Sequence, residues 1–461
     1  MTTAPAPSPT GRVTVGIVSL VLLIAFEAMA VATAMPVAAR ELDGLSLYAW
    51  SFTGFLIAAL FATAVTGEVC DRIGPAAPFL AGVLVFTVGL LVAGFAPGMV
   101  QFVAGRMIQG LGGGAVIVAL YVVVARVYDE SVRPRIFSFM AASWVIPSIV
   151  GPLVSGYITE QWTWRLVFWG TAPFVVVPVL LTLPALRRMP QPDGVAHRRG
   201  RAPLALSAAV GAGALQYAGQ RVEHDDWAVA GLAAVVGVGL LVPGLLRLLP
   251  AGTLRVRRGL PAVVALRGAM CGAFFGAESY VPLMMVEHRG LSTTLGGLTL
   301  TGAALGWASA SWWQGRPTMR IPRQRLVVVG AVLATTGIAL AGLAAVQTDG
   351  FTVPAWLAAV GWLLGGAGMG LGISCLSVLL FELSPVADQG ANSAAIQIAD
   401  ALASIVMIGT GGVLFALLHG SQPGVVVFGS IFGVMVAGGL VAVGVATRVA
   451  VPVRQSVRVT V

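Results

Sequence analysis

The sequence predicts an all-α polytopic membrane protein with fourteen transmembrane helices. The first observation is its composition: of 461 residues, 57% are hydrophobic and only 10% are charged, and the mean hydropathy is +0.92. A soluble domain carries about 25% charged residues, so this chain has too few charges to face water over its whole surface. The other two observations are a series of long apolar segments and the placement of arginine between them.

Fourteen apolar segments are long enough to cross a bilayer, since a spanning helix needs about 20 residues. The predicted spans lie near residues 13–36, 47–68, 77–97, 99–126, 136–158, 165–186, 203–220, 228–249, 260–286, 291–313, 325–346, 354–381, 390–416 and 423–447. The first segment is longer than the apolar core of a cleaved signal peptide, which is about 7–15 residues. It also contains Glu27, so we expect it to remain in the protein as a helix.

Arginine placement predicts the orientation of the spans. All 27 basic residues are arginine, and with both termini cytoplasmic 21 of them fall in inner loops and tails. Two more lie within spans, and the outer loops hold only Arg40, Arg165, Arg221 and Arg289. This excess is the positive-inside pattern of membrane proteins. It holds from loop to loop, which supports an even number of spans and predicts a multi-pass protein of the cell membrane with cytoplasmic termini.

The spans predict two six-helix bundles joined by a linker that contains two additional transmembrane helices. The bundles cover residues 13–186 and 260–447, and the Arg-rich linker covers 187–259. Residues 1–12 and 448–461 are expected to form cytoplasmic tails.

Several function classes are excluded by what the chain lacks. Without lysine it cannot form the phosphate-gripping loop G-x-x-x-x-G-K-[ST], so ATP is not expected as an energy source. The arginines form no basic face for nucleic acid. The three cysteines and four histidines are isolated and have no metal-ligand spacing, so we expect neither a metal nor a cofactor.

Acidic residues within the spans are the main candidates for chemistry. Three of the 18 acids lie well inside predicted spans: Glu27, Glu278 and Asp400. Burial in a medium of low dielectric disfavours a charged carboxylate, so each can bind and release a proton. Two intramembrane arginines, Arg106 and Arg267, are the expected charge partners of such carboxylates.

Four local motifs carry further information. The loop after the second span contains Gly67, Asp71, Arg72 and Gly74, and the fourth span contains Arg106, Gln109 and Gly110. The fifth span contains Pro147, Gly151, Pro152 and Gly156, and the sixth opens with Trp164-Arg165-Leu166-Val167-Phe168. In the first span, Pro36 follows Glu27 by nine residues.

Together these motifs resemble the major facilitator superfamily, and within it the fourteen-helix drug:proton antiporters. The loop is similar to G-x-L-a-D-R-x-G-R-[KR], although Pro75 and Ala76 replace its last two basic residues. The fourth and fifth spans are similar to R-x-x-Q-G and G-x-x-x-G-P-x-x-G-G, with Pro147 and Ser155 in place of glycine. In the first span, Glu27 stands where the family places an aspartate.

The resemblance implies a role for each motif. The loop is expected to gate the cytoplasmic side, Arg106 to tune the proton affinity of a neighbouring carboxylate, and the fifth-span motif to accompany export. Independently of the resemblance, burial makes Glu27 and Glu278 the first candidates for proton coupling, with Asp400 behind them. Glu27 and Glu278 are expected to face one cavity from symmetry-related helices. Candidate cavity residues are Phe26, Gln109, Trp144 and Tyr280.

We therefore expect a monomeric secondary transporter that exports small amphipathic molecules in exchange for protons by alternating access. Its partners are the substrate, protons and membrane lipid, and its energy source is the proton gradient. Two alternatives on the same fold stay open, a proton-coupled importer of a nutrient and a lipid exporter. A membrane-embedded enzyme is a remote alternative because no catalytic residues cluster, and a non-transporting receptor or scaffold would not need three intramembrane acids.

Overall fold

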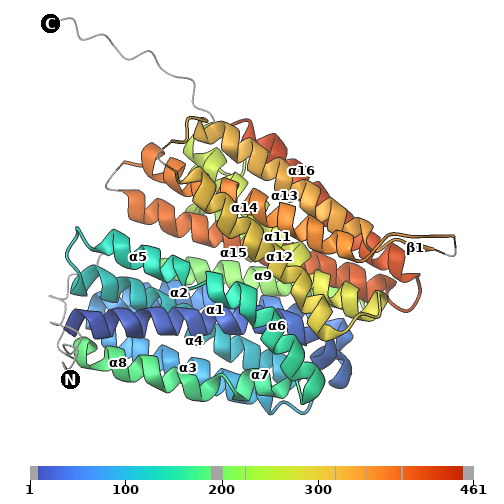
Figure 1. The fold of residues 1–461 in the computed structure, drawn as a ribbon, viewed down its shortest axis with the longest axis horizontal. Coiled ribbons are helices and arrows are strands. Elements are labelled where there is room, and N and C mark those ends of the chain that lie inside the picture. The colour runs from blue at the N-terminus through green and yellow to red at the C-terminus, as the bar shows by residue number, and fades with distance from the viewer. Residues whose placement is uncertain are drawn as a thin grey trace, which may run out of the picture.

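The computed structural model describes residues 9–187, 201–223, 225–316, 318–348, 350–385 and 388–449. These residues are almost entirely helical, and the helices form two bundles that lie side by side (Figure 1). The predicted linker residues 188–200 and most of the two predicted tails lie outside the described residues.

The first half of the chain forms six helical segments. Two of them are interrupted where proline removes a backbone N–H and leaves the carbonyl one turn earlier without a donor: Pro147 follows the first break, and Pro173 lies in the second. The elements are α1 (Pro9–Glu41), η1 (Leu45–Leu47), α2 (Tyr48–Ile73), α3 (Ala76–Gly94), α4 (Met99–Val127), α5 (Arg133–Ala142) with α6 (Val145–Gln161), and α7 (Arg165–Trp169) with η2 (Ala172–Val175) and α8 (Val176–Leu186).

The second half begins with the two linker helices and continues with six more segments. The elements are α9 (Arg201–Glu223), α10 (Trp227–Leu248), α11 (Leu260–Leu283) with the π-helical turn η3 (Met284–His288), α12 (Thr293–Gln314), α13 (Arg323–Leu343), α14 (Trp356–Leu383), α15 (Gln389–Leu418) and α16 (Gly424–Ala446). A short hairpin of β1 (Gln347–Thr348) and β2 (Phe351–Thr352) joins α13 to α14 and projects from one end of the molecule (Figure 1).

The predicted all-α fold with fourteen membrane-length segments is confirmed. Twelve of the segments in the described residues are long and apolar enough to cross a membrane, and α9 and α12 are not among them. Both of these helices pack between other helices: α9 contacts α2, α10 and α15, and α12 contacts α6 and α14. At the N-terminal side, the described part of α1 reaches back to Pro9, four residues before the predicted span.

Two seams join the bundles. On one, α2 and α9 pack against α15, and on the other α6 packs against α12. Most of the buried side chains are aliphatic or aromatic. The larger of two clusters reaches from α1 to α16, and a smaller one lies between α2, α9, α10 and α15. The seams determine which residues can meet between the two halves.

Candidate functional site

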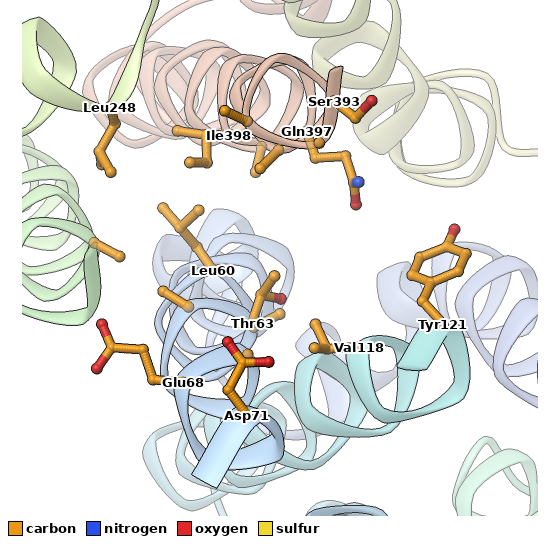
Figure 2. Close-up of a pocket in the computed structure, with 18 of the residues that line it drawn as sticks. Leu60, Thr63, Glu68, Asp71, Val118, Tyr121, Leu248, Ser393, Gln397 and Ile398 are labelled. Carbon is orange, nitrogen blue, oxygen red and sulfur yellow. The ribbon is translucent and has the colours of Figure 1, made fainter. Parts of the chain in front are cut away.

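A cavity of about 600 Å³ lies between the two bundles (Figure 2). Helices α2 and α4 line it from the first bundle, α15 from the second, and α9 and α10 from the linker. Most of its wall is apolar. Its polar side chains are Thr63, Glu68, Asp71, Tyr121, Ser393 and Gln397. We call the end of the molecule that bears the α2–α3 turn, Gly74 and Pro75, the open end, because the cavity lies there.

The predicted gating loop forms one rim of this cavity. Gly67 and Asp71 line it, and Asp71 is exposed and makes no hydrogen bond or ion pair with the described residues. Arg72 lies 3.9 Å from Glu68, whose other carboxylate oxygen accepts a hydrogen bond from the Ala202 N–H at the start of α9. Gly74 ends α2 with φ 82°, a conformation that disfavours side chains with a Cβ. The loop is therefore a tight turn that also holds the linker helix.

The opposite end, which we call the closed end, is sealed by three contacts between the bundles. Arg40 at the end of α1 pairs with Glu287 of η3 at 2.5 Å. Glu160 of α6 accepts hydrogen bonds from the Thr294 N–H and hydroxyl of α12, at 2.7 and 2.8 Å. The Tyr48 hydroxyl of α2 donates to the carbonyl of Ser279 on α11 at 2.8 Å. The molecule is thus open between its halves at one end and joined at the other.

The predicted antiporter motif supports this closed end through close packing. A Cβ on Gly156 would lie 2.6 Å from the Cα of Thr294, so only glycine allows α6 to approach α12 this closely. Gly151 faces α1, where its Cβ would lie 3.2 Å from that of Met29, and the carbonyl of Pro152 lies against Gly297 of α12. The motif therefore brings three helices from both bundles together.

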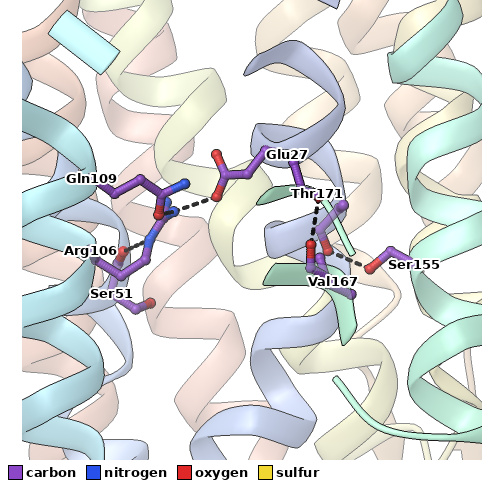
Figure 3. A network of polar contacts seen from close by, with 8 residues as sticks. Glu27, Ser51, Arg106, Gln109, Ser155, Val167 and Thr171 are labelled. Atoms are coloured by element: carbon purple, nitrogen blue, oxygen red, sulfur yellow. Dashed lines mark hydrogen bonds and ion pairs between the residues drawn. The ribbon is translucent and has the colours of Figure 1, made fainter. Parts of the chain in front are cut away.

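An ion pair lies inside the first bundle, between α1 and α4 (Figure 3). Glu27 is 0% exposed and Arg106 is 4% exposed. The Arg106 Nη1 donates to Glu27 Oε1 and to Gln109 Oε1, each at 2.5 Å, and its Nε donates to the carbonyl of Ser51 at 3.0 Å. The guanidinium also lies 4.8 Å from the centre of the Phe55 ring.

One oxygen of the Glu27 carboxylate makes no hydrogen bond with the described residues. Glu27 Oε2 and the Gln109 amide nitrogen are buried and have no hydrogen-bond partner among the described residues. Removing either member of a buried pair costs about 3–5 kcal/mol, because the other charge is left uncompensated. The second oxygen is a position where a proton can bind without first displacing another group.

A second ion pair lies in the other bundle. Arg267 of α11 donates through Nε to Asp400 Oδ2 of α15 at 3.0 Å, and through Nη1 to the Ser377 hydroxyl of α14 at 3.0 Å. Asp400 Oδ1 is buried and has no hydrogen-bond partner among the described residues. Arg267 thus pairs with a carboxylate from another helix, Asp400, whereas Glu278 lies on the same helix as Arg267.

Glu278 stands apart from both pairs. It is half-buried on α11 and forms no hydrogen bond or ion pair with the described residues. It lies one helical turn from Phe274 and Phe275, whose rings stack on Trp362 and Trp307 respectively. Among the residues that line the cavity in the described part of the chain, none of the three acids occurs. Their proton-coupling roles stay predictions.

The four predicted cavity residues do not line the cavity either. Gln109 binds Arg106, and Tyr280 is buried with its hydroxyl donating to the carbonyl of Ile408 at 2.6 Å. Phe26 is half-buried beside Gly151, and Trp144 is exposed at the break between α5 and α6. Their contact with substrate stays a prediction for a state in which the bundles are arranged differently.

Sequence reasoning missed most of the polar groups of the cavity and of the closed end. Thr63, Ser393 and Gln397 are polar residues within apolar segments, and this signal could have identified them. No local signal marks Arg40 with Glu287, which are 247 residues apart, or Glu160 with Thr294.

Two helical bundles with a cavity between them, and with an ion pair inside each, define a multi-pass membrane protein of the transporter class. The chain belongs to the Major Facilitator Superfamily, whose family model matches residues 17–408. The predicted family membership is therefore confirmed.

The relatives include pumps and proteins without known function. An uncharacterized MFS-type transporter of Mycobacterium tuberculosis is 28% identical over 89% of this chain, and the match covers 58% of that relative, less than two thirds of its length. The multidrug transporter protein MdtP of Bacillus subtilis is 22% identical, with 80% of this chain and 68% of MdtP covered. The multidrug efflux pump SdrM of Staphylococcus aureus is 23% identical, with 71% of this chain and 75% of SdrM covered.

Solved structures support the fold. The POT family transporter PepTSo superimposes with a TM-score of 0.71 at 12% identity, covering 96% of this chain and 98% of that one. A D-xylose-proton symporter gives a TM-score of 0.64 at 16% identity, covering 96% of this chain and 98% of that one. At this identity the likeness concerns the fold alone.

Proposed function

We propose that this protein exports small amphipathic molecules in exchange for protons by alternating access. The observation that carries the proposal is the buried Glu27–Arg106 pair with its unpartnered carboxylate oxygen. A charge pair inside a membrane bundle is costly to keep and marks functional sites in membrane proteins. Here it joins α1 to α4, so its charge state can change how these helices pack.

In the proposed cycle, a proton binds Glu27 at its free oxygen Oε2 and neutralises the carboxylate. The attraction to Arg106 is then lost, and the guanidinium keeps its bonds to Gln109 and the Ser51 carbonyl. Loss of the pair favours a different packing of α1 against α4 and so couples the proton to movement of the bundle. Glu278 and Asp400 are the acids proposed to take part from the second bundle.

The chemistry of the cavity supports the proposed substrate class. Its volume of about 600 Å³ lies within the range of about 300–1,000 Å³ that is usual for drug-sized ligands. Its wall is mostly apolar, and the only charged side chains in the described lining are the carboxylates Glu68 and Asp71. Such a surface favours neutral or cationic amphipathic molecules over anions.

Three considerations support export through the cell membrane. Under the arginine bias both termini are cytoplasmic, so the open end faces the cytoplasm and substrate enters from there. The motif containing Gly151, Pro152 and Gly156 resembles that of exporters, and it lies at the contact between the bundles. The relatives MdtP and SdrM are described as a multidrug transporter and a multidrug efflux pump. We propose a monomer that needs the proton gradient and no bound cofactor.

Substitution Glu27→Gln tests the proposal. In proteoliposomes with an imposed pH gradient, we expect proton-driven transport of an amphipathic cationic dye to be lost in this variant. The matched control is Glu130→Gln, which removes a carboxylate whose side chain is 90% exposed in the loop between α4 and α5, and it should transport like the unmodified protein. Unimpaired pH-dependent transport by Glu27→Gln would overturn the assignment.

The direction of transport and the identity of the transported molecule distinguish the rival functions. An importer would accumulate substrate together with protons in right-side-out vesicles, whereas the proposed exporter would expel it as protons enter. A lipid exporter would move labelled phospholipid between leaflets and leave the dye unaffected. An enzyme or a scaffold would move neither.

A further inference from the structure

Five arginines form a cluster at the open end of the molecule, outside the cavity. Arg247 lies in the last turn of α10, and Arg255, Arg257 and Arg258 lie in the turn that joins α10 to α11. The fold adds Arg448 from the end of α16, whose carbonyl accepts a hydrogen bond from the Gly259 N–H at 3.4 Å. We call these five residues the arginine cluster.

The turn that carries the cluster is a folded structure. The Gly252 carbonyl accepts hydrogen bonds from the N–H groups of Arg255 and Arg257, and the hydroxyl of Thr253 donates to the Pro250 carbonyl at 2.7 Å. Val256 packs against the core with φ 49°, and a β-branched residue adopts this conformation only under strain. The surrounding contacts therefore impose one conformation on the turn, in which the neighbouring arginines point outward.

The guanidinium groups of this cluster are exposed and have no partner in the part of the chain that the structure describes. All five side chains are exposed, and none forms a hydrogen bond, ion pair or ring contact with the described residues. No acidic residue occurs between Asp226 and Glu278. Two arginines in the turn between α4 and α5, at the same end, have partners: Arg133 bonds to the Tyr128 carbonyl and Arg135 lies over the Phe139 ring.

The arginine cluster lies at the end of a membrane-length helix, so it can contact the lipids around the protein. It follows directly on α10, a membrane-length helix, and it lies beside the ends of α11 and α16. Leu254, between the arginines, is 54% exposed. Charges on the rim of a membrane helix and an apolar side chain beside them match the boundary between headgroups and acyl chains.

We propose that the arginine cluster binds the headgroup of an anionic phospholipid. A positive-inside preference explains why arginines occur in this loop. It does not require a strained turn to present them together, nor Arg448 to join them from 190 residues further along the chain. The guanidinium fork suits phosphate because it can donate two parallel hydrogen bonds. Leu254 would lie against the first carbons of the acyl chains.

Native mass spectrometry of the purified full-length chain tests the proposal, with phosphatidylglycerol and phosphatidylcholine as probes. We expect phosphatidylglycerol to bind more tightly to the unmodified protein. In the Arg255→Gln/Arg258→Gln variant this affinity should fall about fivefold for each arginine removed, since each is worth about a factor of five near an anionic surface. Arg257 is left in place because its stem packs against Gly252.

The control is Arg133→Gln/Arg135→Gln, which removes two arginines that already have partners in the protein, and it should keep its phosphatidylglycerol affinity. The Arg255→Lys/Arg258→Lys variant keeps the charge and reports on folding, and it should lose at most part of the affinity. Equal affinity of the unmodified protein for the two lipids would overturn the proposal. So would equal losses in the cluster variant and in the control.

Discussion

Arg106 and Glu27 form an ion pair inside the first bundle, where both side chains are buried. Each charge offsets part of the free-energy cost of burying the other. On membrane insertion scales a single arginine or aspartate at the centre of a helix costs about 2.5–3.5 kcal/mol. The 2.5 Å contact and the bonds to Gln109 and Ser51 offset much of that cost for the pair. The pair stabilises the fold only while both members are present.

Substitution Arg106→Met should therefore destabilise the protein by about 3–5 kcal/mol, because Glu27 is left as a buried, uncompensated charge. Adding Glu27→Gln to this variant should restore part of the stability, since the second change removes that charge. The measurement is thermal unfolding in detergent of both single variants and the double variant. If the two effects simply add, the residues do not interact in the folded protein.

Among the helices, α6 makes a close contact with the other bundle, against α12. Proline breaks separate it from α5, and Gly156 lets its far end touch α12 at Thr294. The same end carries Glu160, which bonds to the first turn of α12. Small residues and a terminal carboxylate thus act together in one element to close one side of the molecule.

Substitution Gly156→Ala should weaken this closure. The added methyl group would lie 2.6 Å from backbone atoms of α12, so the helices must separate. Gly231→Ala in α10 is the matched control, because its methyl group would meet nothing within 4 Å. The expected results are slower transport and greater labelling of a cysteine placed at Leu295 for Gly156→Ala only. The control should gain up to about 1 kcal/mol from better helix propensity.

At the scale of the whole molecule, the two bundles are separated at the open end and joined at the closed end. The cavity separates α2 from α15 at one end, while Arg40, Glu160 and Tyr48 bind the other bundle at the opposite end. Exposed ion pairs are worth only about 0.2–1 kcal/mol. The exposed Arg40–Glu287 pair and the exposed Glu160–Thr294 bonds therefore each add little to the free energy that holds the closed end together.

The Arg40→Gln/Glu160→Gln variant should shift the protein toward opening at the closed end. At about 0.2–1 kcal/mol for each lost contact, the population of that state should rise several-fold. Spin labels at Trp162 and Leu295, both exposed at the closed end, would report a longer distance. Glu130→Gln at the open end is the control. An unchanged distance distribution would show that these contacts do not hold the closed end together.

Much of the architecture could be predicted from local sequence. The bilayer sets a minimum length for each apolar segment, and arginine marks one side, so the helix count follows without any knowledge of packing. The intramembrane acids and arginines were also visible, because charge is rare in such segments. Their pairing was not, since Arg106 could have met Glu27, Glu278 or Asp400 with equal justification.

By itself, the sequence determined that this chain lies in a membrane, that it has fourteen helical segments and that it belongs to one superfamily. These properties depend on composition, period and short motifs, which are local. Only the tertiary structure decided that Glu27 meets Arg106 while Asp400 meets Arg267, and that the cavity is lined by Thr63, Ser393 and Gln397 instead of the four predicted cavity residues. The reason is physical: these contacts join residues that are far apart in the chain, and helix packing chooses among partners that the sequence leaves equivalent.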